Sequence, residues 1–142
     1  MSDPTTNPPT TQTPVSGRDT ASGSTSDPRF DAERLDCYRV ALEFQGVAAK
    51  FLPRRGCGSL RDQLDRASLS IVLNIAEGVG RFSPGEHAHF LGIARGSATE
   101  CAAILDIALA RGWTDAAAAR HARGPLLRLV QMLTRFNQSL SR

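Results

Sequence analysis

The chain of 142 residues carries 17 Lys or Arg against 14 Asp or Glu, for a formal net charge of +3. This length fits a single domain. The sequence lacks an apolar stretch of the roughly 18 residues that a membrane-spanning helix needs, and it lacks the apolar core of a signal peptide. We therefore expect a cytoplasmic protein without a membrane partner. Its mild positive charge permits contact with nucleic acid without requiring it.

The three cysteines, Cys37, Cys57 and Cys101, are odd in number and far apart in the sequence. They form no CxxC pair and no cluster with histidine, so neither a disulfide framework nor a zinc site is indicated. We expect buried free thiols in a reducing compartment.

Residues 1–29 form a leader rich in Ser, Thr, Pro and Gly, with two Arg against three Asp and a net charge of −1. Such a segment buries too little apolar surface to offset the entropy of ordering, so it is predicted to be disordered. A role as a phosphorylated or partner-binding tail stays open. Residues 30–142 hold 15 basic against 11 acidic residues, net +4, and their apolar residues recur at helical spacing.

Two helices are predicted in the first half of this domain, over residues 31–50 and 59–77, separated by the helix-breaking stretch PRRGCG. The apolar face of the first helix consists of Leu35, Tyr38, Leu42, Gln45, Ala49 and Leu52. The core face of the second consists of Leu60, Leu64, Ala67, Ile71 and Ile75. Gly78 and Gly80 are predicted to end the second helix, because glycine tolerates the left-handed conformation of a helix terminus.

A third helix is predicted to begin in a capping box, with Ser83 at the N-cap, Pro84 at the first helical position and Glu86 at the third. Its inner face consists of Phe90, Ala94, Ser97, Cys101, Leu105 and Ala108, and Gly112 closes it.

A fourth helix is predicted to begin at the N-cap Thr114 and to be kinked or divided at Gly124-Pro125. Its apolar stripe consists of Leu126, Leu129, Val130, Leu133, Phe136 and Leu140. Four amphipathic helices with short connections, and no competing strand pattern, predict an all-α fold, an antiparallel up-down-up-down four-helix bundle.

The second predicted helix has two further faces. A polar stripe within about 80° of arc consists of Gln63, Arg66, Ser70, Asn74 and Glu77. An apolar group on the far side consists of Leu69, Val72, Leu73 and Ala76. A helix that is apolar on two faces often marks an interface, so these four residues are predicted to form a homo-oligomer interface. Coverage by another segment of the same chain is the alternative.

Glu77 could be a metal ligand, a catalytic group or a structural tie. The EHAH stretch supplies only half of the paired Glu-x-x-His motif of a di-iron site. No nucleophile with a base and an orienting group is recognisable, nor a glycine-rich phosphate loop, so we expect no catalytic residue, metal or cofactor. Glu77 is instead predicted to pair with Arg66, Arg81 or Arg95, or with backbone N–H groups of the third helix. The motif predicted to lock the two helices comprises Arg66, Asn74, Glu77, Gly78, Gly80, Arg81, Ser83 and Glu86.

The fourth predicted helix has no acidic residue after Asp115. Four arginines lie within about 80° of one another on its outer side, and they are Arg120, Arg128, Arg135 and Arg142. A stripe of one sign suits the phosphate backbone of RNA or DNA, so these residues are predicted to bind nucleic acid with little sequence specificity. A solvated face or a contact with protein is the alternative.

Residues 34–140 resemble the 23S rRNA intervening-sequence proteins, small bacterial four-helix-bundle proteins, and the motifs lie within residues 60–100. The residues that carry the resemblance are Arg66, Ser70-Ile71, Asn74 to Gly78, Gly80-Arg81, Ser83, Glu86, Phe90-Leu91, Ala94, Gly96-Ser97 and Glu100. The resemblance implies a ring-like homopentamer of such bundles. It also implies a relation to the accessory variability protein of diversity-generating retroelements, which binds nucleic acid and a reverse transcriptase. The chain departs from the family pattern at Tyr38 and Val72, where tryptophan and proline are frequent.

The predicted function is that of a non-enzymatic, oligomeric four-helix-bundle protein that binds the backbone of RNA or DNA. An oligomeric adaptor that binds protein partners and no nucleic acid is the alternative. The two differ in their response to salt, because only phosphate binding weakens steeply as the salt concentration rises.

Overall fold

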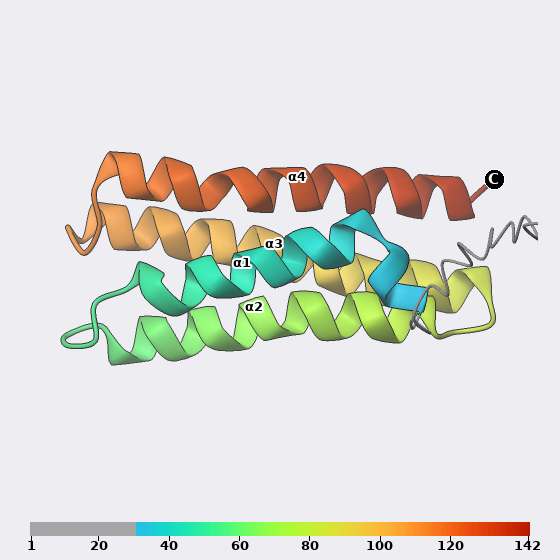
Figure 1. Cartoon of the computed structure of the whole chain (residues 1–142), viewed down its shortest axis with the longest axis horizontal. Helices are drawn as coiled ribbons and strands as arrows, with labels where there is room; N and C mark the ends of the chain where they lie inside the picture. The colour runs from blue at the N-terminus through green and yellow to red at the C-terminus, as the bar shows by residue number, and fades with distance from the viewer. Residues whose placement is uncertain (1–30) are drawn as a thin grey trace, which may run out of the picture.

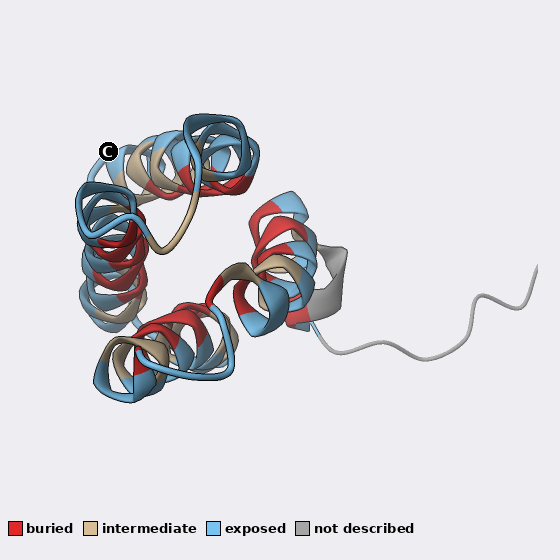
Figure 2. Ribbon diagram, turned by 90° about the vertical axis from the view of Figure 1, so that its left-hand side faces the viewer, coloured by how far each residue is buried: buried red, intermediate tan, exposed pale blue. Residues whose placement is uncertain are grey.

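A computed structural model describes residues 31–142, which form four α-helices after one 3-10 turn. The elements are η1 (Asp31–Arg34), α1 (Asp36–Phe51), α2 (Gly58–Val79), α3 (Pro84–Ala110) and α4 (Ala116–Leu140). Successive helices run antiparallel, and α1 packs against both α2 and α4 to close the bundle (Figure 1). Viewed along the bundle, the buried residues face its centre (Figure 2). The predicted all-α four-helix bundle is confirmed, and the predicted disordered leader lies outside the described residues.

The first helix differs from its prediction in its start and in the face that it buries. α1 begins at Asp36, after the separate turn η1. Leu42, predicted to be buried, is 46% exposed. The residues of α1 that are buried are Cys37, Val40, Ala41, Phe44 and Ala48. The predicted face borders α2 instead, where Gln45 Nε2 donates to the Ser68 carbonyl at 2.7 Å. The prediction was wrong at Leu42 because α1 carries apolar residues on two nearly opposite sides, and only the packing selects one. Leu52 is buried as predicted.

The glycines after the α2 core face act only partly as predicted, because Gly80 is the C-cap of α2. Gly80 has a right-handed φ of −76°, and Gly78 is buried within the helix. A Cβ at Gly78 would lie 3.1 Å from Phe90 Cβ, so this glycine allows α3 to approach α2 closely. Among the described residues, the glycines with positive φ are Gly56, at +86°, and Gly112, at +72°. They turn the chain between α1 and α2 and between α3 and α4.

The core faces of α2 and α3 largely follow the predicted helical period. The predicted residues that are buried are Leu64, Ala67, Ile71, Ile75, Ala94, Ser97, Cys101, Leu105 and Ala108. Leu60 and Phe90 are only partly buried. The capping box of α3 is confirmed, because the Glu86 backbone N–H donates to Ser83 Oγ at 3.2 Å and Pro84 is the first helical residue.

The fourth helix corrects two predictions. Its N-cap is Asp115 and not Thr114, since Asp115 Oδ1 accepts the backbone N–H of Ala118 at 2.8 Å. The helix also continues through Pro125 without the predicted division, whereas the alternative, a kink at this proline, stays a prediction. Pro125 is buried between the buried residues Ala122 and Leu126. Packing of these turns on the neighbouring helices offsets the hydrogen bond that proline cannot make.

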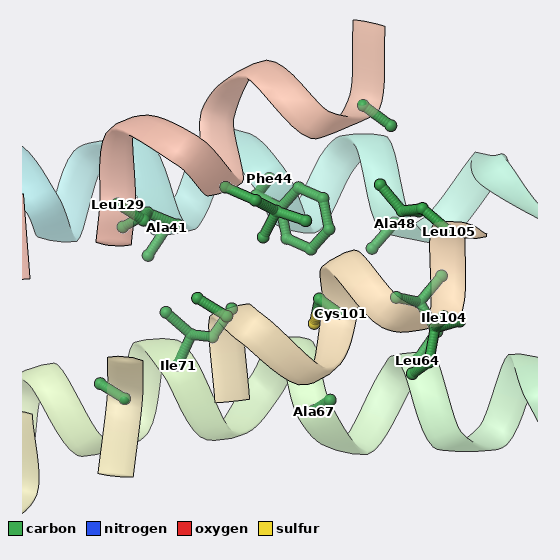
Figure 3. Close-up of a cluster of buried hydrophobic side chains, with 14 of the residues drawn as sticks. Ala41, Phe44, Ala48, Leu64, Ala67, Ile71, Cys101, Ile104, Leu105 and Leu129 are labelled. Atoms are coloured by element: carbon green, nitrogen blue, oxygen red, sulfur yellow. The ribbon is translucent and has the colours of Figure 1, made fainter. Parts of the chain in front are cut away.

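The core is built around Phe44 of α1, whose ring points towards Cys101 of α3 (Figure 3). The buried cluster around this ring also includes small residues, such as Ala41 of α1 and Ala67 of α2. Burial of each large apolar side chain stabilises the fold by about 1.5–3 kcal/mol. No helix within residues 31–142 is long and apolar enough to span a membrane.

All three cysteines are buried and free, as predicted. Burial raises the pKa of the Cys101 thiol to about 12, and it also raises the pKa of Cys37. Both thiols therefore stay protonated, and unreactive as nucleophiles, at neutral pH.

Candidate nucleic-acid interface

Glu77 forms an ion pair with Arg81, one turn further along the chain at the end of α2. The Arg81 guanidinium also lies 4.0 Å from the Glu86 carboxylate and 4.9 Å from the centre of the Phe90 ring. Arg81 therefore ties the end of α2 to the first turns of α3. Because the Glu77 side chain is 48% exposed, this pair stabilises the fold by only about 0.3–0.5 kcal/mol.

The other partners predicted for Glu77 are not used. Arg66 donates to Gln63 Oε1 at 2.6 Å, and Arg95 donates to Thr134 Oγ1 at 2.9 Å. Within residues 31–142, no backbone N–H group of α3 donates to the Glu77 carboxylate. Arg66 thus belongs to the packing of α2, whereas Arg95 links α3 to α4.

The polar stripe of α2 packs against α3 and forms what we call the α2–α3 seam. The Ser70 and Ser97 hydroxyls lie 2.8 Å apart. Asn74 Nδ2 donates to the Ser70 carbonyl at 2.8 Å and to its hydroxyl at 3.0 Å. At the other end of the seam, Gln63 Nε2 donates to Glu100 Oε1 at 2.6 Å. These polar groups satisfy one another within the chain, which is the arrangement of a structural contact.

The histidines lie away from the seam. His87 bonds to the Arg81 carbonyl, His89 packs against the edge of Phe90, and His121 lines a recess between α1 and α4. In the part of the chain that the structure describes, no group of three or more His, Cys, Asp or Glu could hold a metal ion. The expectation that the protein has no catalytic residue stays a prediction.

The apolar group on the far side of α2, which we call the α2 patch, consists of Leu69, Val72, Leu73 and Ala76. Leu69 is 51% exposed and Leu73 is 64% exposed, while Val72 and Ala76 are half-buried. Phe82, in the α2–α3 connection, is fully exposed and lines one recess together with Ala76. No segment within residues 31–142 covers Leu69 and Leu73. Their role as an oligomer interface stays a prediction.

The four predicted arginines of α4, Arg120, Arg128, Arg135 and Arg142, are all exposed on one continuous helix or directly after it. They are not equivalent, because Arg128 pairs with Glu43 of α1 at 3.1 Å. Among the described side chains, the other three form no ion pair. The stripe is therefore neutralised near its middle and keeps free charge on both sides of Arg128.

A further arginine that sequence analysis did not assign to this surface lies beside it. Arg95 of α3 reaches across to Thr134 of α4. The two helices form a recess of about 370 Å³ there, lined by Arg95, Thr134, Asn137, Gln138, Ser141 and Arg142. The helical period alone could not find this group, because it depends on the register between α3 and α4.

The opposite end of the bundle is also basic. Arg54 and Arg55 lie in the connection between α1 and α2, and Arg111 lies at the end of α3. These connections are at the same end of the molecule (Figure 1). The Arg111 guanidinium lies 5.2 Å from the centre of the Trp113 ring. Sequence analysis did not single out this group either.

The geometry defines a small antiparallel helical bundle whose polar α2 residues serve the packing of α3. Its α4 face exposes three arginines, Arg120, Arg135 and Arg142, that form no ion pair with a described side chain. The chain belongs to the 23S rRNA-intervening sequence protein family, whose model matches residues 33–135. Among curated proteins, none matches the chain significantly. The family resemblance is confirmed, whereas the relation to the accessory protein of retroelements stays a prediction.

Proposed function

We propose that the protein is a non-enzymatic homo-oligomer that binds the sugar-phosphate backbone of RNA or DNA through the outer face of α4. The observation that carries this proposal is the state of Arg120, Arg135 and Arg142, which are exposed and form no ion pair with any described side chain. An unpaired guanidinium keeps its full charge and its donors for a phosphate. The family name refers to an intervening sequence in 23S rRNA, which favours RNA as the natural target.

Self-association would strengthen this binding. The exposed leucines of the α2 patch lie on a different helix from the arginines, so a contact through the patch leaves α4 free. In a closed homo-oligomer, such as the pentamer that the resemblance implies, every copy adds one set of arginines. Several weak phosphate contacts on one strand then act together as avidity. Leu73→Lys is expected to dissociate the oligomer, measured as a fall in mass by light scattering.

The test is binding of the purified protein to structured RNA and to duplex DNA at about 50 mM and about 200 mM salt. We expect binding to weaken at least tenfold across this range, because phosphate binding releases counterions. The variant Arg135→Ala/Arg142→Ala is expected to lose most of the binding.

The matched control is Arg39→Ala/Arg66→Ala, which removes the same charge from α1 and α2. It is expected to bind almost as well as the unchanged protein. An oligomer that ignores both nucleic acids at the lower salt concentration would overturn the nucleic-acid proposal.

That outcome would favour the second candidate, an oligomeric adaptor for protein partners. The observation in its favour is the fully exposed Phe82 beside the α2 patch, together with the Glu43 carboxylate that neutralises Arg128. A reverse transcriptase, the partner that the resemblance implies, belongs to this alternative. An adaptor of this kind would retain its partner in the Arg135→Ala/Arg142→Ala variant and lose it on substitution of Phe82.

A further inference from the structure

The recess between Arg95 and the end of α4 has the composition of a ligand site. Its six lining residues are all polar or charged, and two are arginines, while no carboxylate side chain lines it. Its volume of about 370 Å³ is at the small end of the range for ligand pockets. It suits one sugar-phosphate unit and leaves a nucleobase outside. The recess lies where α4 ends beside the early turns of α3 (Figure 1).

The hydrogen bonds within the recess restrict what it can bind. The Thr134 hydroxyl donates to the carbonyl one turn back at 2.7 Å and accepts from Arg95 Nε. The Ser141 hydroxyl donates to the Asn137 carbonyl at 3.2 Å. Both hydroxyl protons are therefore used. The donors left for a ligand include the terminal N–H groups of the two arginines, which suit phosphate oxygens.

Asn137 supplies the complementary acceptor. Its Oδ1 is buried and meets no donor within residues 31–142. A half-turn of the amide about its last torsion turns Oδ1 towards the recess, and such torsions are broad and nearly two-fold.

We propose that this recess binds one ribose-phosphate unit of an RNA strand, with the phosphate on Arg95 and Arg142 and the ribose 2′-hydroxyl donating to Asn137 Oδ1. The 2′-hydroxyl and the 3′-phosphate stand on neighbouring ribose carbons, so one unit presents a donor beside several acceptors. DNA lacks this hydroxyl, so the recess selects RNA over DNA. This inference rests on the proposed backbone binding and adds the site that distinguishes the two nucleic acids.

The position of the recess makes both arginines necessary. The C-terminal end of a helix carries partial negative charge, which opposes a phosphate. The recess lies at that end of α4, so the helix dipole partly offsets the attraction of a single guanidinium for the phosphate. Two guanidinium groups are therefore needed. Arg95→Ala is therefore expected to weaken RNA binding at least fivefold, although Arg95 lies outside the α4 stripe.

The experiment compares single-stranded RNA, DNA and 2′-O-methyl RNA of one sequence, by fluorescence anisotropy at low salt. The protein is expected to bind RNA at least fivefold more tightly than the other two strands. Asn137→Leu is expected to remove this preference, so that RNA and DNA bind equally. Gln131→Leu is the matched control, because it removes an exposed amide of α4 outside the recess, and it is expected to keep the preference. Thermal unfolding by circular dichroism verifies that both variants are folded.

Equal binding of RNA and DNA by the unchanged protein would overturn this inference and leave the proposed function standing. Binding of neither single strand would also overturn this inference, and the proposed function falls only if structured RNA and duplex DNA fail to bind as well. A preference for RNA that persists in Asn137→Leu would place the selection elsewhere and overturn the role of the recess. A ribonucleoside 3′-monophosphate that binds as tightly as the strand would assign the recess to a free nucleotide, and would overturn the assignment to RNA.

Discussion

The α2–α3 seam and the outer face of α4 use arginine in different ways. Beside the seam, Arg81 pairs with Glu77 and lies 4.0 Å from the Glu86 carboxylate. On α4, Arg135 and Arg142 form no ion pair with any side chain that the structure describes. The comparison teaches that arginine content does not identify a binding surface. A surface is available to a phosphate only where the chain itself has not neutralised the charge.

Among the substitutions between α2 and α3, a large side chain at Gly78 should lower the free energy of unfolding most. Gly78→Leu is expected to lower the free energy of unfolding by about 3 kcal/mol, because overpacking at this level is costly and the new Cβ would lie 3.1 Å from Phe90 Cβ. The control is Gly92→Leu on the outer side of α3, where a Cβ meets nothing within 4 Å. Helix propensity predicts a gain of up to about 1 kcal/mol there. Equal destabilisation of both variants in urea denaturation would contradict the close packing of α2 on α3.

On α4, an arginine without an ion pair, Arg135, can be compared with a paired one, Arg128, on the same helix. Arg135→Ala is expected to weaken nucleic-acid binding about tenfold, or about 1.4 kcal/mol, because its guanidinium is unpaired. Arg128→Ala is expected to weaken it by less than about threefold, because Glu43 already holds that guanidinium at 3.1 Å. Binding isotherms at low salt measure both changes. If Arg128 proves the more important residue, the ion pair with Glu43 does not restrain it in solution.

Within the seam, the paired hydroxyls should make a smaller contribution. Ser97→Ala is expected to lower the free energy of unfolding by about 1 kcal/mol, since Ser97 is buried and bonds to Ser70 across the seam at 2.8 Å. Ser139→Ala is the matched control, because that hydroxyl is exposed and bonds only within its own helix. The same denaturation experiment measures both variants. If Ser97→Ala leaves the free energy of unfolding unchanged, the hydroxyl pair does not stabilise the seam.

The smallest effect is expected at Glu77. Glu77→Gln should lower the free energy of unfolding by only about 0.3–0.5 kcal/mol, because the pair with Arg81 is half exposed. The loss should vanish in about 1 M salt, where exposed charges are screened. A loss of several kcal/mol that persists in high salt would instead indicate a buried role for this carboxylate.

Local sequence rules predicted much of the fold. The capping box at Ser83 and the core face of α2 follow from interactions within a few residues, and both are confirmed. The predicted buried face of α1 was wrong, because Leu42 and Phe44 lie about 160° apart around the helix, on two apolar stripes with the same period. The local pattern is equally compatible with either stripe, and the neighbouring helices decide between them.

The sequence by itself determined that α4 carries arginines on one side, because the helical repeat places residues seven apart on the same face. Only the tertiary structure decided which of them are free. Arg128 meets a carboxylate 85 residues away, and Arg95 meets Thr134 39 residues away. Such contacts depend on the register between packed helices, which no local period specifies. The charge of the surface is therefore encoded locally, whereas its availability to a partner is decided by packing.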